Sequence, residues 1–198
     1  MFETERLIEI GGLLIVLLAV YGQTGLFFCF FLPSGGLLFM SGVFIATNHV
    51  EYNLLTVCLL SILASLLGNV TGYGIGYRSG SVLYRKGDSR FFKKRYLTAA
   101  EDFYRKYGAI ALSVGLFLPL IRTFGPIVAG VIKVSFIRFL LFVFIGSTAW
   151  IISFIGVGYL IGSMPFLQPY LKFVILGILV IVTGPIVFKI VKELRKKQ

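Results

Sequence analysis

Residues 117–131 read FLPLIRTFGPIVAGV, and this stretch decides the fold because it is too apolar for water and too broken for one regular helix. It lies within an apolar block, 108–132, that carries one charge near its centre, Arg122. Proline lacks a backbone donor and breaks a helix interior. Irregular backbone is tolerated at membrane depth only where protein or a water-filled cavity surrounds it. We therefore predict a re-entrant hairpin here, broken at Pro119, Gly125 and Pro126.

The composition indicates that lipid is the solvent of the whole chain. Of its 198 residues, 58% are hydrophobic and 14% are charged, whereas soluble domains have about one quarter charged residues. A helix needs about 20 apolar residues to cross about 30 Å of hydrocarbon. The apolar residues fall in six blocks near that length, at 7–22, 25–47, 54–77, 108–132, 136–161 and 170–190.

The block 25–47 has the same character as 108–132. It is interrupted by Pro33, Ser34, Gly35 and Gly36, so we predict a second re-entrant hairpin. The remaining four blocks are expected to be full transmembrane helices. The fold class is therefore all-α, a polytopic membrane protein with two hairpins and about four spans.

Basic residues set the predicted orientation. They gather in the segment 78–107 and in the C-terminal tail, and cytoplasmic loops carry an excess of Lys and Arg. Three full crossings between these regions would put them on opposite sides, so one of the intervening blocks must not cross. Both termini are then cytoplasmic, and no signal peptide is expected. The net charge of +11 is expected to meet anionic lipid rather than nucleic acid.

A short internal repeat joins the two interrupted blocks. The tripeptide FLP occurs twice, and each copy is followed by a Gly-Val pair and then by a Gly-Tyr pair. Under the topology above the two hairpins enter from opposite sides, which is an architecture of transporters with a binding site near the midplane. Chance matches in a chain rich in Gly, Leu and Phe are the alternative. The matched segments are 31–33, 42–43 and 76–77 in the first copy, and 117–119, 130–131 and 158–159 in the second.

The predicted parts of the chain follow from this repeat. We expect a single membrane domain over residues 1–198. It would contain a first repeat at about 25–80, a basic cytoplasmic segment at about 78–107, a second repeat at about 108–163 and a C-terminal transmembrane helix at about 170–190.

Arg122 is the main candidate for a binding residue. A charge within the membrane is costly enough to indicate function, and a guanidinium offers a planar, permanently charged fork that suits phosphate. Ends of broken helices nearby would add donors. The alternative is that Arg122 binds exposed backbone carbonyls or reaches toward the interface. Gln23, Thr24, Asn69, Thr71 and Thr123 are the other polar residues near this depth, and interhelical hydrogen bonding is their alternative role.

The sequence offers little for catalysis or metal binding. No acidic residue lies within an apolar block beyond the N-terminal edge, so a nucleophile, base and acid cannot be assembled. His49 is the single histidine and is expected in an external loop, so we predict no metal site. Trp150 is expected to pack inside its span. We predict neither an enzyme nor a cofactor.

Several short motifs follow one another along the chain: Phe31-Leu32-Pro33, Leu37-Leu38, Gly42, Gly68-Asn69, Gly72-Tyr73, Gly76, Tyr107-Gly108, Phe117-Leu118-Pro119, Arg122-Thr123-Phe124, Ala129-Gly130, Phe139 and Trp150. Taken in order, these motifs resemble the DedA family, also called the SNARE-associated Golgi protein or VTT family, over about 23–162. The resemblance implies two opposed re-entrant hairpins. It also implies a role in moving lipids, since bacterial members are implicated in returning undecaprenyl phosphate to the cytoplasmic leaflet and eukaryotic relatives in scrambling phospholipids.

The chain departs from the family pattern at its charged positions. Gln23, Gly35 and Asn69 stand where the family has acidic residues, and Leu116 stands where it has an arginine. Arg122 is the intramembrane charge that remains. Protonation of a buried carboxylate is the usual way to couple transport to protons, so an uncoupled flippase or scramblase is expected.

The sequence therefore predicts a lipid transporter of the inner (cell) membrane, moving undecaprenyl phosphate or a phospholipid between leaflets. Membrane lipids are its expected partners, and association of copies is left open. A small-solute or ion transporter using the same cavity, or a non-transporting scaffold whose basic loop recruits anionic lipid, are the alternatives. The predicted substrate-binding residues are Arg122, Thr123, Gly35, Gly36, Gln23 and Asn69.

Overall fold

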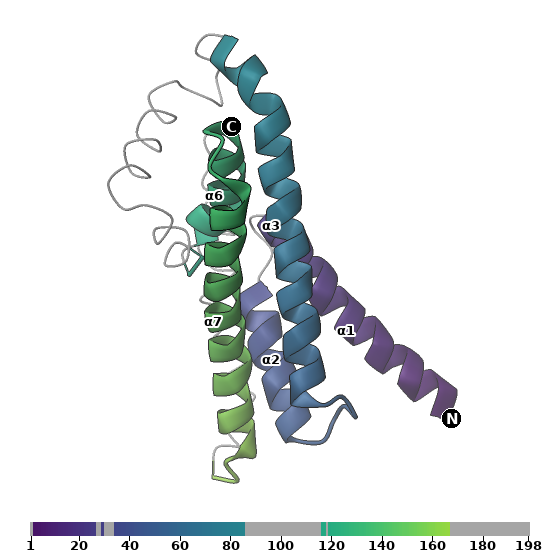
Figure 1. Cartoon of the computed structure of the whole chain (residues 1–198). Coiled ribbons are helices and arrows are strands. Elements are labelled where there is room, and N and C mark those ends of the chain that lie inside the picture. Colours follow the sequence, from purple (N-terminus) through teal and green to yellow (C-terminus); the bar gives the residue numbers. More distant parts are fainter. Residues whose placement is uncertain (1, 27–28, 30–33, 86–115, 118, 167–198) are drawn as a thin grey trace, which may run out of the picture. The chain divides into compact units, whose positions relative to one another are not determined.

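The computed structural model describes residues 2–26, 29, 34–85, 116–117 and 119–166 (Figure 1). The described part is built of helices and contains no strand. The predicted segments 86–115 and 167–198, including the C-terminal transmembrane helix, lie outside it. The helices are α1 (Phe2–Gly25), α2 (Ser34–Ala46), α3 (Leu54–Arg85), α6 (Pro119–Val131) and α7 (Phe136–Ser163).

Two of these helices are long and apolar enough to cross a membrane. They are Leu54–Gly80 within α3, with 27 residues, and Phe136–Ser163, with 28 residues. At 1.5 Å per residue each is about 40 Å long, more than the roughly 30 Å of hydrocarbon. The helices α2 and α6 have 13 residues each and are only about 20 Å long. Neither short helix can cross the membrane alone.

The first predicted boundary differs from the structure. A break was expected at Gln23 and Thr24, between the blocks 7–22 and 25–47, but α1 continues to Gly25. The Thr24 hydroxyl donates to the carbonyl oxygen of Val20 at 2.8 Å. A threonine that bonds back to its own helix satisfies its polar group without ending the helix.

The described chain divides into two compact units that interleave along the sequence. Among the described residues, unit 1 comprises 2–16, 34–59 and 151–166, and unit 2 comprises 17–26, 29, 60–85, 116–117 and 119–150. Unit 1 therefore contains α2 with the second half of α7, and unit 2 contains α6 with most of α3. The prediction of a single domain over residues 1–198 stays a prediction.

Within unit 1, α2 packs closely and in parallel on α7. A Cβ atom on Gly42 would overlap the carbonyl oxygen of Ile155 and lie 2.8 Å from the Tyr159 nitrogen. A Cβ atom on Gly158 would overlap the carbonyl oxygen of Phe39. Small residues at such a crossing let two backbones approach closely.

Within unit 2, α6 packs on α3 in the same manner. A Cβ atom on Gly130 would overlap the carbonyl oxygen of Tyr73 and lie 2.7 Å from the Tyr77 nitrogen. A Cβ atom on Gly76 would overlap the carbonyl oxygen of Ile127. The Gly-Val and Gly-Tyr pairs of the sequence repeat thus meet in both units, and each pair meets its counterpart from the other repeat. The short helix of each repeat therefore packs on the long helix of the other repeat.

Both short helices also end in the same way. After α2, Asn48 has a φ of 54°, and His49 N donates to Phe44 O at 2.9 Å. After α6, Lys133 has a φ of 54°, and Val134 N donates to Ala129 O at 3.0 Å. A left-handed residue with this hydrogen bond is the Schellman helix end. It reverses the chain within a few residues of each long helix, so each short helix is tied to the span that follows it.

One side chain anchors the second of these helix ends. The Tyr73 hydroxyl donates to the Val134 carbonyl oxygen at 2.6 Å, and Tyr73 is buried. We expect Tyr73→Phe to lower the free energy of unfolding by about 1 kcal/mol, because the bond is lost and the ring is kept. Thermal unfolding in detergent measures the change. Tyr77→Phe is the matched control because Tyr77 is 51% exposed, and an equal loss in both variants would contradict the assignment.

Candidate functional site

Besides Ser61, seven polar side chains are buried in unit 2, and we call these seven the polar cluster. Each is at most 5% exposed. They come from the end of α1, the middle of α3, the first turns of α6 and the first half of α7. Polar groups buried in an apolar setting are costly unless they are hydrogen-bonded, so a concentration of them indicates a function or a specific packing role. The members are Gln23, Thr24, Ser65, Asn69, Arg122, Thr123 and Ser147.

Arg122 is the charged member of the cluster. It lies in the first turn of α6 and is 5% exposed. Its guanidinium carbon lies 3.9 Å from the ring centroid of Trp150, which is a cation–π contact. Trp150 therefore does more than the packing expected from the sequence.

The prolines of α6 shape the surroundings of Arg122. Pro119 is the first helical residue, where a missing N–H is tolerated. Pro126 lies inside the helix and offers no N–H to the carbonyl four residues earlier, which is that of Arg122. The helix α6 begins at Pro119, but it continues through Gly125 and Pro126 to Val131, so the predicted break at Gly125 and Pro126 is wrong. The proline removes one backbone hydrogen bond without ending the helix. Residues 108–115, the first limb of the predicted hairpin, lie outside the described residues.

Hydrogen bonds connect α6, α1 and α3 around the cluster. The Thr123 hydroxyl donates to the Gln23 carbonyl oxygen at 2.9 Å. The Thr24 hydroxyl lies 3.4 Å from the Ser65 carbonyl oxygen. Thr71 and Tyr21 share a hydrogen bond of 3.2 Å at a half-buried position. The interhelical bonding expected as an alternative for Thr24, Thr71 and Thr123 is therefore present.

Ser65 connects α3 to α7 and also holds Asn69. Its Nδ2 donates to the Ser65 carbonyl oxygen at 2.7 Å and lies 3.3 Å from Ser65 Oγ. Ser65 Oγ in turn shares a hydrogen bond of 2.9 Å with Ser147 Oγ. Asn69 Oδ1 is buried and accepts no hydrogen bond from another described residue. One half of this amide is satisfied and the other is open to a donor.

Two of the predicted binding residues belong to unit 1. Gly35 and Gly36 lie in the first turn of α2, and a Cβ atom on Gly35 would lie 3.0 Å from the Phe154 ring. The cluster in unit 2 contains the other four predicted residues, Arg122, Thr123, Gln23 and Asn69. Pro33 lies outside the described residues. Binding by any of the six stays a prediction.

Sequence reasoning missed Ser65 and Ser147. A signal was present, since Ser61, Ser65 and Asn69 recur at every fourth residue and therefore share one face of a helix. Ser147 had no comparable signal, because a lone serine in an apolar span bonds to its own backbone as readily as to a partner.

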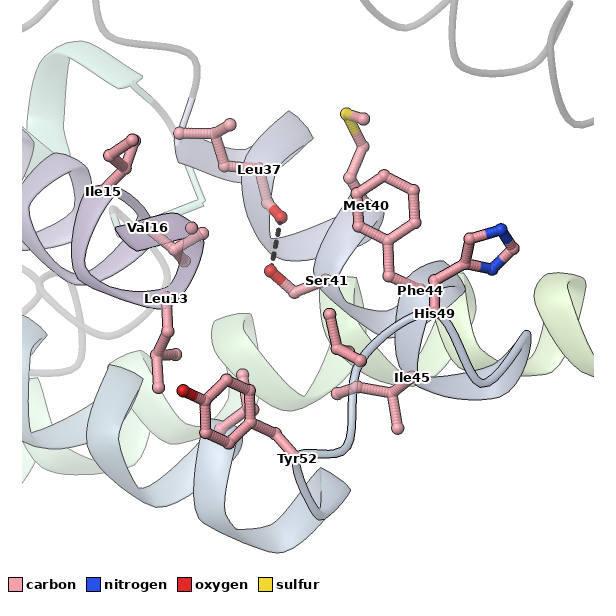
Figure 2. A pocket seen from close by; sticks show the side chains of 13 residues that line it. Leu13, Ile15, Val16, Leu37, Met40, Ser41, Phe44, Ile45, His49 and Tyr52 are labelled. Atoms are coloured by element: carbon pink, nitrogen blue, oxygen red, sulfur yellow. Dashed lines mark hydrogen bonds between the residues drawn. The ribbon is translucent and has the colours of Figure 1, made fainter. Parts of the chain in front are cut away.

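Unit 1 contains a pocket of a different kind. Its volume is about 420 Å³, within the roughly 300–1,000 Å³ range of small-molecule sites. Figure 2 shows Leu13, Ile15 and Val16 of α1 beside the lining side chains of α2. Ser41, a polar lining residue, donates back to the Leu37 carbonyl oxygen at 2.8 Å (Figure 2). The lining suits a hydrocarbon chain better than an anion or a water-soluble solute.

Comparison with known proteins agrees with these features. The VTT domain family model matches residues 12–160. Protein DedA of Escherichia coli K12 is 33% identical over 181 residues, which cover 91% of this chain and 83% of that protein. No solved structure matches the chain.

Two further relatives are named as membrane proteins. An uncharacterized membrane protein of Mycobacterium tuberculosis is 39% identical over 165 residues, covering 82% of this chain and 71% of the relative. The inner membrane protein YqjA of Escherichia coli K12 is 30% identical over 169 residues, covering 81% and 73%. The chain is a membrane protein and belongs to the DedA family, whose members carry the VTT domain.

Proposed function

We propose that this protein moves a lipid phosphate between the two leaflets of the inner membrane and that Arg122 binds the phosphate. The observation that carries the proposal is the guanidinium at 5% exposure in the first turn of a short helix with an internal proline. An ionisable group within a membrane protein is a functional-site hypothesis by default, and a guanidinium fits a phosphate with two parallel hydrogen bonds. Undecaprenyl phosphate or a phospholipid is the proposed substrate.

The proposal includes the architecture expected from the sequence. Two inverted re-entrant hairpins, formed around the blocks 25–47 and 108–132, would meet near the midplane among about four full spans. Both termini would be cytoplasmic. The length of α2 and α6 supports this, because 13-residue helices reach only about two thirds of the way across the hydrocarbon. The exchange of short helices between the repeats supports a common origin for the two hairpins.

Three features support a lipid rather than a soluble anion. Many large apolar side chains on α1, α3 and α7 are exposed, as expected where a protein meets acyl chains. The pocket of unit 1 has an apolar lining that suits a hydrocarbon tail. The polar cluster, in contrast, is lined by hydroxyl, amide and guanidinium groups that suit a head group. Each of these features, taken by itself, suits one part of a lipid phosphate.

The test is a leaflet-accessibility assay in proteoliposomes that contain a labelled polyprenyl phosphate or a labelled phospholipid. Wild-type protein is expected to expose the inner-leaflet label to an external reagent faster than protein-free vesicles and faster than Arg122→Ala. Efflux of a water-soluble anion with no lipid movement would favour the solute transporter. Neither activity, with vesicle binding that depends on residues 85–95, would favour the scaffold.

A further inference from the structure

We infer that the pocket of unit 1 holds one acyl chain of a bilayer phospholipid, which stays bound in one leaflet as a resident part of the protein. The lipid of the proposed function moves, whereas this lipid keeps its head group at the connector 47–53 between α2 and α3. The inference concerns unit 1 and does not depend on Arg122, which belongs to unit 2. It therefore goes beyond the proposed function.

The first observation is the lining that the helices give to the pocket. It is apolar apart from Ser41, and the Ser41 hydroxyl already donates to the Leu37 carbonyl oxygen at 2.8 Å (Figure 2). Water needs several polar partners to occupy such a space, and apolar cavities remain dry. An empty pocket would also forfeit dispersion contacts along its lining. Hydrocarbon is the filling that this lining accepts.

The second observation is that the rim of the pocket is exposed while its base is buried. Ile15 is 62% and Phe44 is 38% exposed, whereas Val16 is 8% and Val57 is 2% exposed. In a membrane protein, exposed apolar side chains of this kind face acyl chains, which are as apolar as leucine. A chain of the surrounding bilayer can therefore enter the pocket from the side.

The volume of the pocket suits a single chain. About 420 Å³ holds roughly 14 heavy atoms at about 30 Å³ each, which is the share of one water molecule in the liquid. One acyl chain of about that length fills the space, and the second chain of the same lipid stays in the bilayer. The bound chain would contact α1, α2 and the start of α3 together, and so hold the first half of α1 in place.

The polar groups of the pocket that remain, His49 and Tyr52, lie on the connector (Figure 2). The Thr47 hydroxyl donates to the Val43 carbonyl oxygen at 2.9 Å, so it accepts from His49 Nδ1–H at 2.7 Å. In the neutral ring His49 Nε2 is then an acceptor, and the Tyr52 hydroxyl is able to donate. One acceptor and one donor suit the glycerol and ester groups at the head of an acyl chain.

The connector also lies where a head group is expected. The apolar helix α2 ends at Ala46, directly before it, and the span within α3 begins at Leu54, directly after it. Residues between two such helices lie at the membrane–water interface, where tyrosine is enriched. A head group at the connector is therefore at the membrane surface, while its chain lies between α1 and α2.

Charge separates this pocket from a phosphate site. No lysine or arginine lines it, and the connector carries Glu51 as its single Asp, Glu, Lys or Arg. A phosphate would gain no opposite charge there, so we expect binding to depend on the chain and not on the charge of the head group. Beyond the connector the pocket offers no open polar partner, and a head group that moved deeper would lose its hydration without compensation. The lipid therefore stays in one leaflet.

Two neighbouring glycines of α1 supply a matched pair of positions. A Cβ atom on Gly12 would have no other atom within 4 Å, and Gly12 lines the pocket. A Cβ atom on Gly11 would likewise have no other atom within 4 Å, but Gly11 is not part of the lining. A larger side chain at Gly12 fills the pocket, whereas the same side chain at Gly11 does not.

The test is photo-cross-linking of the full chain in proteoliposomes. The probes are phosphatidylglycerol and phosphatidylethanolamine with one acyl chain of about 14 carbons, carrying a diazirine either beside the ester or near the chain end. We expect the chain-end diazirine to label α1 and α2 at the pocket, and the diazirine beside the ester to label the connector. Peptide mass spectrometry identifies the labelled residues. Equal yields are expected for the two head groups.

The variants Gly12→Phe and Gly11→Phe then test the pocket itself. Gly12→Phe is expected to lower chain-end labelling at the pocket by at least about tenfold, because the ring takes the place of the chain and its contacts. Gly11→Phe is expected to keep the wild-type yield. Equal labelling of the two folded variants would overturn the inference. Absence of acyl labelling at the pocket in wild-type protein would overturn it as well, whether a second copy or another segment of this chain fills the space.

Leaflet exchange in the same vesicles separates the resident lipid from the transported one. Translocation that continues in Gly12→Phe, after the labelling is lost, is the result expected for a resident lipid. Loss of translocation together with the labelling would assign the pocket to the moving lipid, which contradicts this inference and leaves the proposed function standing. A labelled pocket in wild-type protein that translocates no lipid would support the inference and remove the proposed function.

Discussion

Arg122→Ala is expected to abolish lipid translocation while the protein remains folded. The guanidinium is proposed to make two charge-assisted hydrogen bonds to the phosphate, each worth about 1.5–3 kcal/mol. Arg122 is the charged side chain among the buried residues that the structure describes. Loss of its two hydrogen bonds to the phosphate is therefore expected to lower the translocation rate by at least about a hundredfold. Fluorescence-detected leaflet exchange measures this loss, and size-exclusion chromatography checks the fold.

Stability is expected to change little in the same variant. Removal of an arginine at 5% exposure ends the desolvation penalty of its charge, which offsets the lost contact with Trp150. A structural role predicts the opposite pattern. If Arg122→Ala unfolds the protein, or if folded Arg122→Ala transports lipid at the wild-type rate, the binding role is wrong.

Companion variants separate charge from geometry. Arg122→Lys keeps the charge but loses the planar guanidinium and its contact with the Trp150 ring, so an intermediate rate is expected. Trp150→Leu keeps the Arg122 guanidinium but removes its cation–π contact, which is worth about 2 kcal/mol in a desolvated site. Arg138→Ala is the matched control, because Arg138 is exposed near the start of α7, and it is expected to transport normally.

The boundaries of the two spans could be predicted from hydropathy. The blocks 54–77 and 136–161 begin at the same residues as α3 and α7. The end of α3 could not be predicted in this way, because the helix continues beyond the apolar block, through a polar segment, to Arg85. Hydropathy reports which solvent a residue prefers, whereas a helix continues for as long as its backbone hydrogen bonds do.

The candidate site could be predicted in part for a similar reason. Arg122 stood out because a charge in an apolar block is rare. Ser65 and Ser147 did not, because their significance lies in a contact between residues 82 positions apart. The repeat could be recognised from its motifs, but sequence similarity does not say which copy packs on which. The exchange of α2 and α6 between the repeats is a property of the three-dimensional packing alone.

Gly158→Ala and Gly76→Ala are expected to give the largest losses of stability. In each case the new methyl group would overlap a backbone carbonyl oxygen, that of Phe39 on α2 or that of Ile127 on α6. No rotamer change can move a backbone oxygen, so the two helices must separate. Overpacking of this kind costs about 1–3 kcal/mol or more. Unfolding midpoints in detergent measure the loss.

Each helix offers its own control two residues away. A methyl group added to Gly156 on α7 or to Gly74 on α3 would have no other atom within 4 Å. Alanine there is expected to be neutral or to stabilise by up to about 1 kcal/mol, because alanine favours the helix over glycine. Opposite signs within one helix would establish close backbone contact as the cause. Equal effects at Gly156 and Gly158 would contradict it.

The same pattern in both units would explain why the motifs recur. Gly42 and Gly158 close the contact of α2 with α7, and Gly130 and Gly76 close that of α6 with α3. If Gly76→Ala also slows translocation by moving α6, the polar cluster depends on this contact for the position of Arg122. The Gly-Val and Gly-Tyr pairs then mark one helix crossing used twice, which holds each short helix against a long one.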